Sequence, residues 1–283
     1  MNKFNKQEKT KELFNKLIDG VTSIIDSGEY NKFLRFSKNF HNYSFNNILL
    51  IYLQMKNATK VAGFKTWQSM GRKVKAGEKG IQIIYPIKRS FTKINKKQDA
   101  NEELEEKKIV EYYLYRPTYV FDVSQTEGDP LPLESRNLNT NNKQELFDLL
   151  CSFSRFPIKE MELFGDTKGY WHPKKKYIVL EKRLSIDDKV TVLIHELTHA
   201  LYDDFDYSEN RNLSETFVES VAFVVADYFG LDNSNYSFNY ITYWAKGNEK
   251  EFLSLGDKIQ KTANEFIKSL EEFANNKIER KVC

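Results

Sequence analysis

Apolar residues follow a helical period in the first part of the chain and a strand-like period after it. Residues 7–57 predict mainly helices, with a break at Ser27–Gly28, where glycine interrupts the pattern. Runs rich in β-branched and aromatic residues predict strands at 81–87 and 109–123. The segment between them, 93–108, is charged and poor in apolar residues, so it is predicted to be a long hairpin loop.

The second half of the chain opens with a predicted helix at 143–154 and a predicted strand at 170–180. Ser185 and Asp188 have the spacing of a capping box, and no Gly or Pro follows them before Asp204, so a helix is expected there. Its apolar stripe consists of Val190, Leu193, Ile194, Leu197 and Leu201.

Two further helices are expected toward the C-terminus. One begins at Asn212 and runs to Gly230, because glycine commonly follows the last turn of a helix. The other, 247–277, is charged and amphipathic, has a possible break near Gly256, and is expected to cover the core with a solvated outer face.

A stretch rich in turn-forming residues separates the two halves. Residues 124–142 contain two prolines and four asparagines, which favour irregular structure. The pattern therefore predicts an α+β protein with an N-terminal helix-plus-sheet domain, 1–128, a linker, 129–142, and a C-terminal domain, 143–283.

Composition narrows the class of protein. With 40% hydrophobic and 29% charged residues, the chain is expected to be soluble and globular. The longest apolar run, 48–53, is too short to span a bilayer, and the first residues lack the apolar stretch of a signal peptide. Cys151 and Cys283 provide no disulfide framework. We therefore expect a cytoplasmic protein that does not bind membranes.

The net charge of +3 conceals an asymmetry between the two halves. Residues 1–125 contain 23 Lys and Arg against 13 Asp and Glu, a balance of +10, so the remainder carries −7. A basic half joined to an acidic half indicates two domains with different partners, and a polyanion is the natural partner of the basic one.

Residues 195–199 read His-Glu-Leu-Thr-His, the pattern with the most chemical content in the chain. On a helix, His195 and His199 project from one face, one turn apart, so both can bind one metal ion. Glu196 can then take a proton from a metal-bound water. The flanking Thr191 and Val192 are not charged, which indicates a helix covered on both sides with a cleft over the histidines. The simpler alternative is two ordinary histidines beside a surface glutamate.

A third ligand is expected from the following helix. Glu215, Glu219, Ala222 and Ala226 share one face of it, and the two alanines allow close approach to the histidine helix. We predict Glu215 as ligand and Glu219 as a residue that orients a ligand. Exchanged roles remain open, as does a capping role for Glu215 three residues after Asn212. Two histidines, one carboxylate and an open position predict one catalytic Zn²⁺, whereas the two cysteines lie far from the motif.

Aromatic and basic residues alternate between residues 33 and 67, as in proteins that bind single-stranded nucleic acid by stacking and phosphate neutralisation. The glycine-punctuated loop 71–80 lets backbone approach a phosphate. The candidates for DNA contact are Tyr43, Lys65, Trp67, Arg72, Lys73, Lys75 and Lys79. The aromatic residues could instead form the core of a small domain, and the loop could simply be solvated.

Several of these segments resemble a known family. Residues 43–50, Tyr-Ser-Phe-Asn-Asn-Ile-Leu-Leu, 63–67, Gly-Phe-Lys-Thr-Trp, and 75–81, Lys-Ala-Gly-Glu-Lys-Gly-Ile, are similar to the N-terminal domain of ArdC-type antirestriction proteins, and residues 120–128 resemble the segment that closes it. The His-Glu-Leu-Thr-His motif with Glu215 and Glu219 resembles the zincin-like metallopeptidase domain fused to that domain.

The resemblance implies a single-stranded-DNA-binding domain followed by a metallopeptidase of the gluzincin type, carried on a plasmid or conjugative element and protecting incoming DNA from restriction. It implies that His195, His199 and Glu215 are zinc ligands and Glu196 the catalytic base, and it adds Asn46 and Asn47 to the DNA candidates. The expected partners are single-stranded DNA and an unidentified protein substrate. Two alternatives are a non-catalytic DNA protector with a structural metal site, and a regulatory protease that cleaves a repressor.

Overall fold

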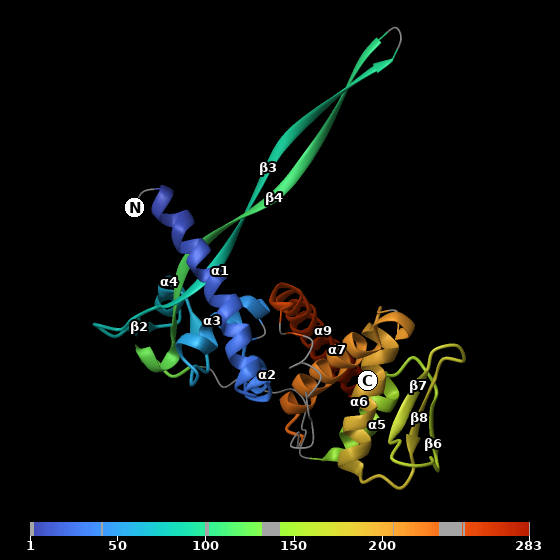
Figure 1. Cartoon of the computed structure of the whole chain (residues 1–283). Coiled ribbons are helices and arrows are strands. Elements are labelled where there is room, and N and C mark those ends of the chain that lie inside the picture. The colour runs from blue at the N-terminus through green and yellow to red at the C-terminus, as the bar shows by residue number, and fades with distance from the viewer. Residues whose placement is uncertain are drawn as a thin grey trace.

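The computed structural model describes residues 3–40, 42–99, 102–131, 142–205, 207–231, 245 and 247–282. Within them, Figure 1 shows helices packed around small sheets and a long two-stranded ribbon that projects from the N-terminal part. The α+β class predicted from the sequence is confirmed. Most of the predicted linker, residues 132–141, lies outside the described residues.

Three helices form the base of the N-terminal part: α1, Lys3–Asp26, α2, Tyr30–Ser37, and α3, Phe45–Gln54. The predicted break is confirmed at Gly28, whose φ of 68° lies in the left-handed region that glycine adopts without strain. Ser44 begins α3, because its side chain accepts a hydrogen bond from the backbone N–H of Asn47.

Short elements and two long strands complete this part. In chain order they are β1, Val61–Ala62, α4, Phe64–Ser69, β2, Arg72–Val74, β3, Ile81–Asp99, β4, Glu102–Asp122, the 3-10 turn η1, Val123–Gln125, and β5, Thr126–Gly128. The three-stranded sheet has the order β1-β4-β3, with both neighbouring pairs antiparallel, and β2 pairs with β5.

The prediction of a hairpin loop at 93–108 is wrong. β3 and β4 stay paired through this segment, from Ile81 opposite Val120 to Asp99 opposite Glu102. The two strands pair through backbone hydrogen bonds, which require no alternation of apolar and polar residues, so the pairing is not visible as the usual strand pattern.

The C-terminal part combines a small sheet with helices. Helix α5, Lys143–Phe153, agrees with the prediction, and it is followed by β6, Ile158–Met161, β7, Gly169–His172, and β8, Tyr177–Glu181. The sheet order is β6-β8-β7, with β6 parallel and β7 antiparallel to β8. The prediction of one strand over 170–180 is therefore wrong. The chain turns back between His172 and Tyr177, where Lys176 has a φ of 53°.

Three helices follow within the described residues: α6, Ile186–Tyr202, α7, Tyr207–Tyr228, and α9, Glu249–Val282. Ser185 caps α6 as predicted. Helix α7 begins five residues before Asn212, so that predicted start is wrong. Helix α9 continues through Gly256, where the predicted break is also wrong. Glycine is needed there for contact, because an added Cβ would lie 2.4 Å from the Phe45 ring.

The predicted N- and C-terminal domains share one continuous hydrophobic core. Helix α2 contacts α7, while α1 and α3 contact α9. Phe252 of α9 packs edge-to-face on both Tyr30 and Phe45, with centroid distances of 5.6 and 6.0 Å. The Tyr30 hydroxyl lies 3.2 Å from the hydroxyl of Ser220. The two halves are therefore joined by buried contacts as well as by the linker.

Among the described residues, no helix has the length and the apolar character needed to cross a bilayer.

Candidate metal centre

Helix α6 carries both histidines on the side opposite its buried stripe. Val190, Leu193, Ile194 and Leu197 are fully buried against the core, as the helical period predicts. Strand β7 lies against α6 on its other side, so close that a Cβ on Gly169 would lie 2.6 Å from Val192. The expected cover on both sides of this helix is therefore confirmed.

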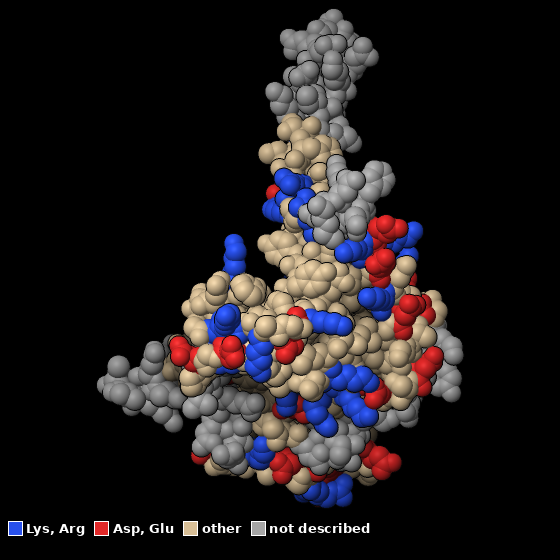
Figure 2. Space-filling model, turned by 90° about the vertical axis from the view of Figure 1, so that its left-hand side faces the viewer, with Lys and Arg blue, Asp and Glu red and all other residues tan. Residues whose placement is uncertain are grey.

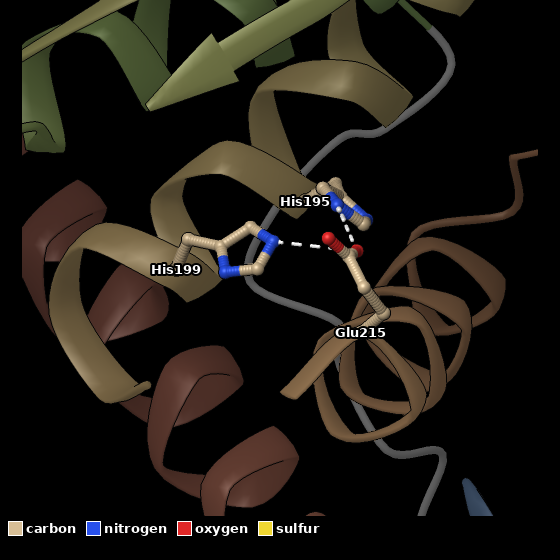
Figure 3. Close-up of side chains that lie close together, drawn as sticks. All are labelled: His195, His199 and Glu215. Carbon is tan, nitrogen blue, oxygen red and sulfur yellow. Dashed lines mark ion pairs between the residues drawn. The ribbon is translucent and has the colours of Figure 1, made fainter. Parts of the chain in front are cut away.

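Helix α7 brings Glu215 to the two histidines (Figure 3). The Oε2 atom of Glu215 lies 3.7 Å from Nε2 of His195 and 3.6 Å from Nε2 of His199. All three ligand atoms lie within 4.8 Å of one another. Donors bound to zinc at about 2.1 Å in a tetrahedron lie about 3.4 Å apart, so the spacing suits one small divalent cation.

The small residues that the sequence analysis expected to allow this close approach are buried in α7. Ala222 and Ala226, two and three turns beyond Glu215, are both fully buried. Asn212 lies inside α7, not at its start, so the alternative that Glu215 caps the helix is wrong. Glu219 lies one turn from Glu215 but outside the cluster of three ligand atoms. Burial, and then the charge of Glu215, raise the pKa of Glu219 to about 7. Its predicted orienting role stays a prediction.

Asp203 orients His199, a role that the sequence analysis missed. Its Oδ2 atom lies 2.9 Å from Nδ1 of His199 and accepts a 2.6 Å hydrogen bond from the Ser214 hydroxyl. Burial raises the pKa of Asp203, but the hydrogen bonds from His199, Ser214 and the Phe205 N–H together lower it below its ordinary value. The interaction fixes the ring so that Nε2 faces Glu215. Its spacing, four residues after His199, was visible in the sequence.

The site has the electrostatics of a cation-binding site. Burial, and then the charge of His199, lower the pKa of His195 to about 4. Burial also disfavours charge on His199, but the hydrogen bonds of Asp203 and Glu215 outweigh it and raise its pKa to about 9. Two carboxylates thus attract positive charge to the imidazole that both contact, and a metal ion can take the place of the proton.

Glu196 has the position and acidity of a general base. Glu196 is 6% exposed, and burial raises the pKa of its carboxyl group to about 7. A backbone hydrogen bond from Trp171 of β7 lowers that pKa but does not outweigh the effect of burial. A base with a pKa near neutrality exchanges protons most effectively at neutral pH. Glu196 and the three candidate ligand residues line a cleft of about 480 Å³, which Gly169, Tyr170 and Trp171 of β7 also line.

Three tyrosines near the motif in sequence, Tyr170, Tyr177 and Tyr207, are candidates to donate a hydrogen bond to the oxygen of a bound carbonyl, and of these Tyr170 lines the cleft. Tyr177 packs against Tyr170, with a centroid distance of 6.4 Å. The side chain of Tyr207 lies outside the described residues.

Most of the predicted DNA contacts have internal roles in this structure. The prediction that Trp67 stacks on a base is wrong, because its ring is fully buried and its Nε1 donates to the carbonyl of Phe121. The half-buried Tyr43 donates to the carbonyl of Val61. The Asn47 amide bonds both backbone groups of Ile84, so it protects the outer edge of β3.

The basic residues of the predicted loop divide into two groups. Arg72 donates to the backbone of Thr126, Gly128 and Asp129 and so holds β5, while Lys75 donates to the carbonyl of Ser124. Lys65, Lys73 and Lys79 are exposed and available to a ligand. The remaining candidate, Asn46, is partly buried, and its Oδ1 atom has no hydrogen-bond partner in the described structure.

Comparisons with known proteins agree with the fold. Residues 4–121 match the family model for the N-terminal domain of the anti-restriction factor ArdC. The metal-free crystal structure of the antirestriction ArdC protein from plasmid R388 matches with a TM-score of 0.60 at 20% identity, covering 92% of this chain and 97% of that one. Its Mn(II)-bound structure matches with a TM-score of 0.61 at 19% identity, covering 93% and 98%.

A curated relative from Bacillus anthracis, the uncharacterized protein pXO2-81, is 29% identical over 94% of this chain. The chain spans about half, 52%, of that relative's length. The resemblance seen in the sequence is thus confirmed for residues 4–121, which match the ArdC N-terminal domain, and the fold is similar to that of the R388 protein along more than nine tenths of the chain.

Proposed function

We propose that this chain is a zinc-dependent metallopeptidase that also binds single-stranded DNA and acts in the cytoplasm as an antirestriction protein of a mobile element. The convergence of His195, His199 and Glu215 beside Glu196 in an open cleft carries the enzymatic part of the proposal. The ArdC N-terminal domain supports the DNA-binding part. The description of the similar structure as an antirestriction protein of a plasmid supports the biological role.

The donor set favours zinc. Two imidazoles and one carboxylate, with a fourth position open toward a cleft, are typical of catalytic zinc sites. When bound, the cation supplies a Lewis acid that polarises a carbonyl and makes water nucleophilic at neutral pH. The crystal structure of the R388 protein contains Mn(II), so manganese is the competing metal in any assay.

Other residues of the cleft would transfer protons, stabilise charge and bind the peptide. Glu196 accepts a proton from the attacking water and passes it to the leaving amine. Tyr170 lines the same cleft, and its hydroxyl is the candidate donor to the oxygen that gains charge. Strand β7 forms the edge of the described sheet β6-β8-β7 and lines the cleft, so an extended peptide can pair along it beside the Trp171 backbone group that already bonds Glu196.

The first test separates metal binding from hydrolysis. Glu196→Gln should bind zinc as the wild type does but cleave a peptide library about 10²- to 10⁴-fold more slowly, because only the proton acceptor is lost. His195→Ala should lose both properties. Zinc content by mass spectrometry and cleavage rates of the full-length chain provide the two measurements. Normal cleavage by Glu196→Gln would exclude this mechanism.

The same variants test the biological role. Plasmid transfer into a restricting host should be protected by the wild-type chain and less well by Glu196→Gln. Full protection by Glu196→Gln would instead indicate a non-catalytic DNA protector. Cleavage of a repressor without any protection of DNA would indicate a regulatory protease.

A further inference from the structure

Strands β3 and β4 form an arm that stands clear of the body (Figures 1 and 2). Large apolar side chains are exposed along its described part, with Tyr85 60%, Phe91 51% and Tyr112 42% exposed. Others on the arm are Ile109, Tyr113, Leu114, Tyr115 and Tyr119. Single exposed apolar residues are common on proteins, but a contiguous group of this kind marks an interaction surface.

The strand register sorts these residues onto two faces, because directly opposed residues project to the same side of a sheet. One face carries the pairs Tyr85–Arg116, Ile87–Leu114, Arg89–Tyr112 and Phe91–Val110, and we call it the aromatic-arginine face. The opposite face carries the pairs Pro86–Tyr115, Lys88–Tyr113, Ser90–Glu111 and Thr92–Ile109.

Phe91 and Tyr112 pack edge-to-face on each other at 5.9 Å on the aromatic-arginine face, whereas the contacts of the arm with helix α1 lie on the opposite face. Helix α1 packs there, with Phe14 edge-to-face on Tyr115 at 5.8 Å. Lys88 forms a 2.8 Å ion pair with Glu111 on the same face. The aromatic-arginine face, in contrast, contains no acidic residue between Tyr85 and Phe91 or between Val110 and Arg116. Arg89 and Arg116 are both exposed on it.

Two arginines without an acidic neighbour on this face, set among exposed rings, favour a partner with negative charges and flat apolar groups. Single-stranded nucleic acid has both, since its bases stack on aromatic rings and its phosphates pair with arginine. Two of the pairs, Tyr85–Arg116 and Arg89–Tyr112, set a ring beside a guanidinium group, and these two pairs lie about 14 Å apart along the strands. A protein partner would have to supply carboxylates to bury the same two arginines.

We propose that the aromatic-arginine face of the arm is the platform on which this chain binds single-stranded DNA, with Tyr85, Phe91 and Tyr112 stacking on bases and Arg89 and Arg116 contacting phosphates. The inference rests on the proposed DNA-binding function and assigns it to a surface. That surface is distinct from the segment 43–79, where the sequence placed its candidates and where most of them have internal partners.

The test uses the full-length chain, a fluorescent oligo-dT and anisotropy at several salt concentrations. Phe91→Ala and Tyr112→Ala should each weaken binding roughly 5- to 150-fold, the loss expected for one stacked base. Arg89→Gln combined with Arg116→Gln should lower affinity and flatten the slope of log affinity against log salt by about 1.4, since two phosphate contacts are lost. All of these positions are exposed, so an unchanged melting temperature would show that the variants are folded.

Tyr113→Ala and Lys88→Gln on the opposite face are matched controls and should change affinity less than twofold. Equal affinity of the face variants and the controls, with normal binding by the wild type, would overturn the inference and leave the proposed function standing. If the wild type fails to bind oligo-dT, both fail together. Face variants that dissociate an oligomer of the chain without affecting DNA binding would show that the face joins two copies instead.

Discussion

At the scale of single residues, the metal centre depends on groups that hold its ligands in place. Nδ1 of His199 is engaged by Asp203, which in turn accepts from Ser214 and from the Phe205 N–H. These bonds join the end of α6 to the first half of α7, the two helices that supply all three ligands. Asp203 is therefore a positioning residue whose effect should appear first in metal affinity.

Asp203→Ala is expected to lower zinc affinity about 10- to 100-fold, because His199 loses the partner that fixes its ring. Competition against a chromophoric chelator measures this loss. Asp204→Ala is the matched control, since that neighbouring carboxylate lies at the surface and pairs with Lys258. Equal affinities of the two variants would show that Asp203 does not position the ligand.

At the scale of elements, the end of β8 is held by one carboxylate. Glu181 accepts from the side chain and backbone N–H of Arg183 and from the backbone N–H of Leu163. The Arg183 side chain, followed by these backbone groups, lowers the pKa of Glu181 to about 2. Through these bonds the carboxylate ties the loop after β6 to the turn that precedes α6.

This carboxylate should contribute to the pH dependence of stability. Because its pKa is lower in the folded chain than in the unfolded chain, its stabilisation is complete above about pH 4.5 and is lost as pH falls toward 2. Urea unfolding at several pH values should show that Glu181→Gln is less stable at pH 7 and loses less stability on acidification. Glu162→Gln, at a more exposed carboxylate that pairs with Lys182, should retain the wild-type pH profile. Parallel profiles of Glu181→Gln and wild type would contradict the assignment.

At the scale of the whole molecule, the two predicted domains are held together by their shared core. Besides the aromatic contacts of Phe252, Asp227 of α7 pairs with Lys38 at 2.6 Å and with Arg35 at 3.2 Å, both near α2. The basic N-terminal half and the acidic C-terminal half thus meet at an interface that contains opposite charges. A stable N-terminal fragment is not expected, since separation would expose Tyr30 and Phe45.

Phe252→Ala should therefore destabilise both halves together, by about 3–5 kcal/mol, the usual result of removing a buried phenylalanine ring. Calorimetry and hydrogen exchange of α3 and α6 measure the effect. Phe164→Ala is the matched control, because Phe164 is 98% exposed and its loss should leave the melting temperature unchanged. Two separate melting transitions, only one of them shifted, would show that the halves fold independently.

The features of the site that depend on the local spacing of residues could be predicted from the amino-acid sequence. Ser185 with Asp188 set the start of α6, and the helical period placed His195 and His199 on one face with Glu196 between them. The helical period of the following segment also made Glu215 a candidate for the side of α7 that meets the histidines. These predictions are possible because the position of a side chain around a helix depends only on its residue number along the helix.

Contacts between side chains of different helices and strands became visible in the three-dimensional structure. It brought Glu215 to within 3.7 Å of both histidines, and it placed Asp203 against His199. It buried Trp67 and engaged Arg72, residues whose types also suit DNA binding, because packing partners are not encoded in spacing. The charged segment 93–108 forms part of the arm in the structure. Backbone pairing holds the two strands together there, although the sequence shows no apolar pattern typical of strands.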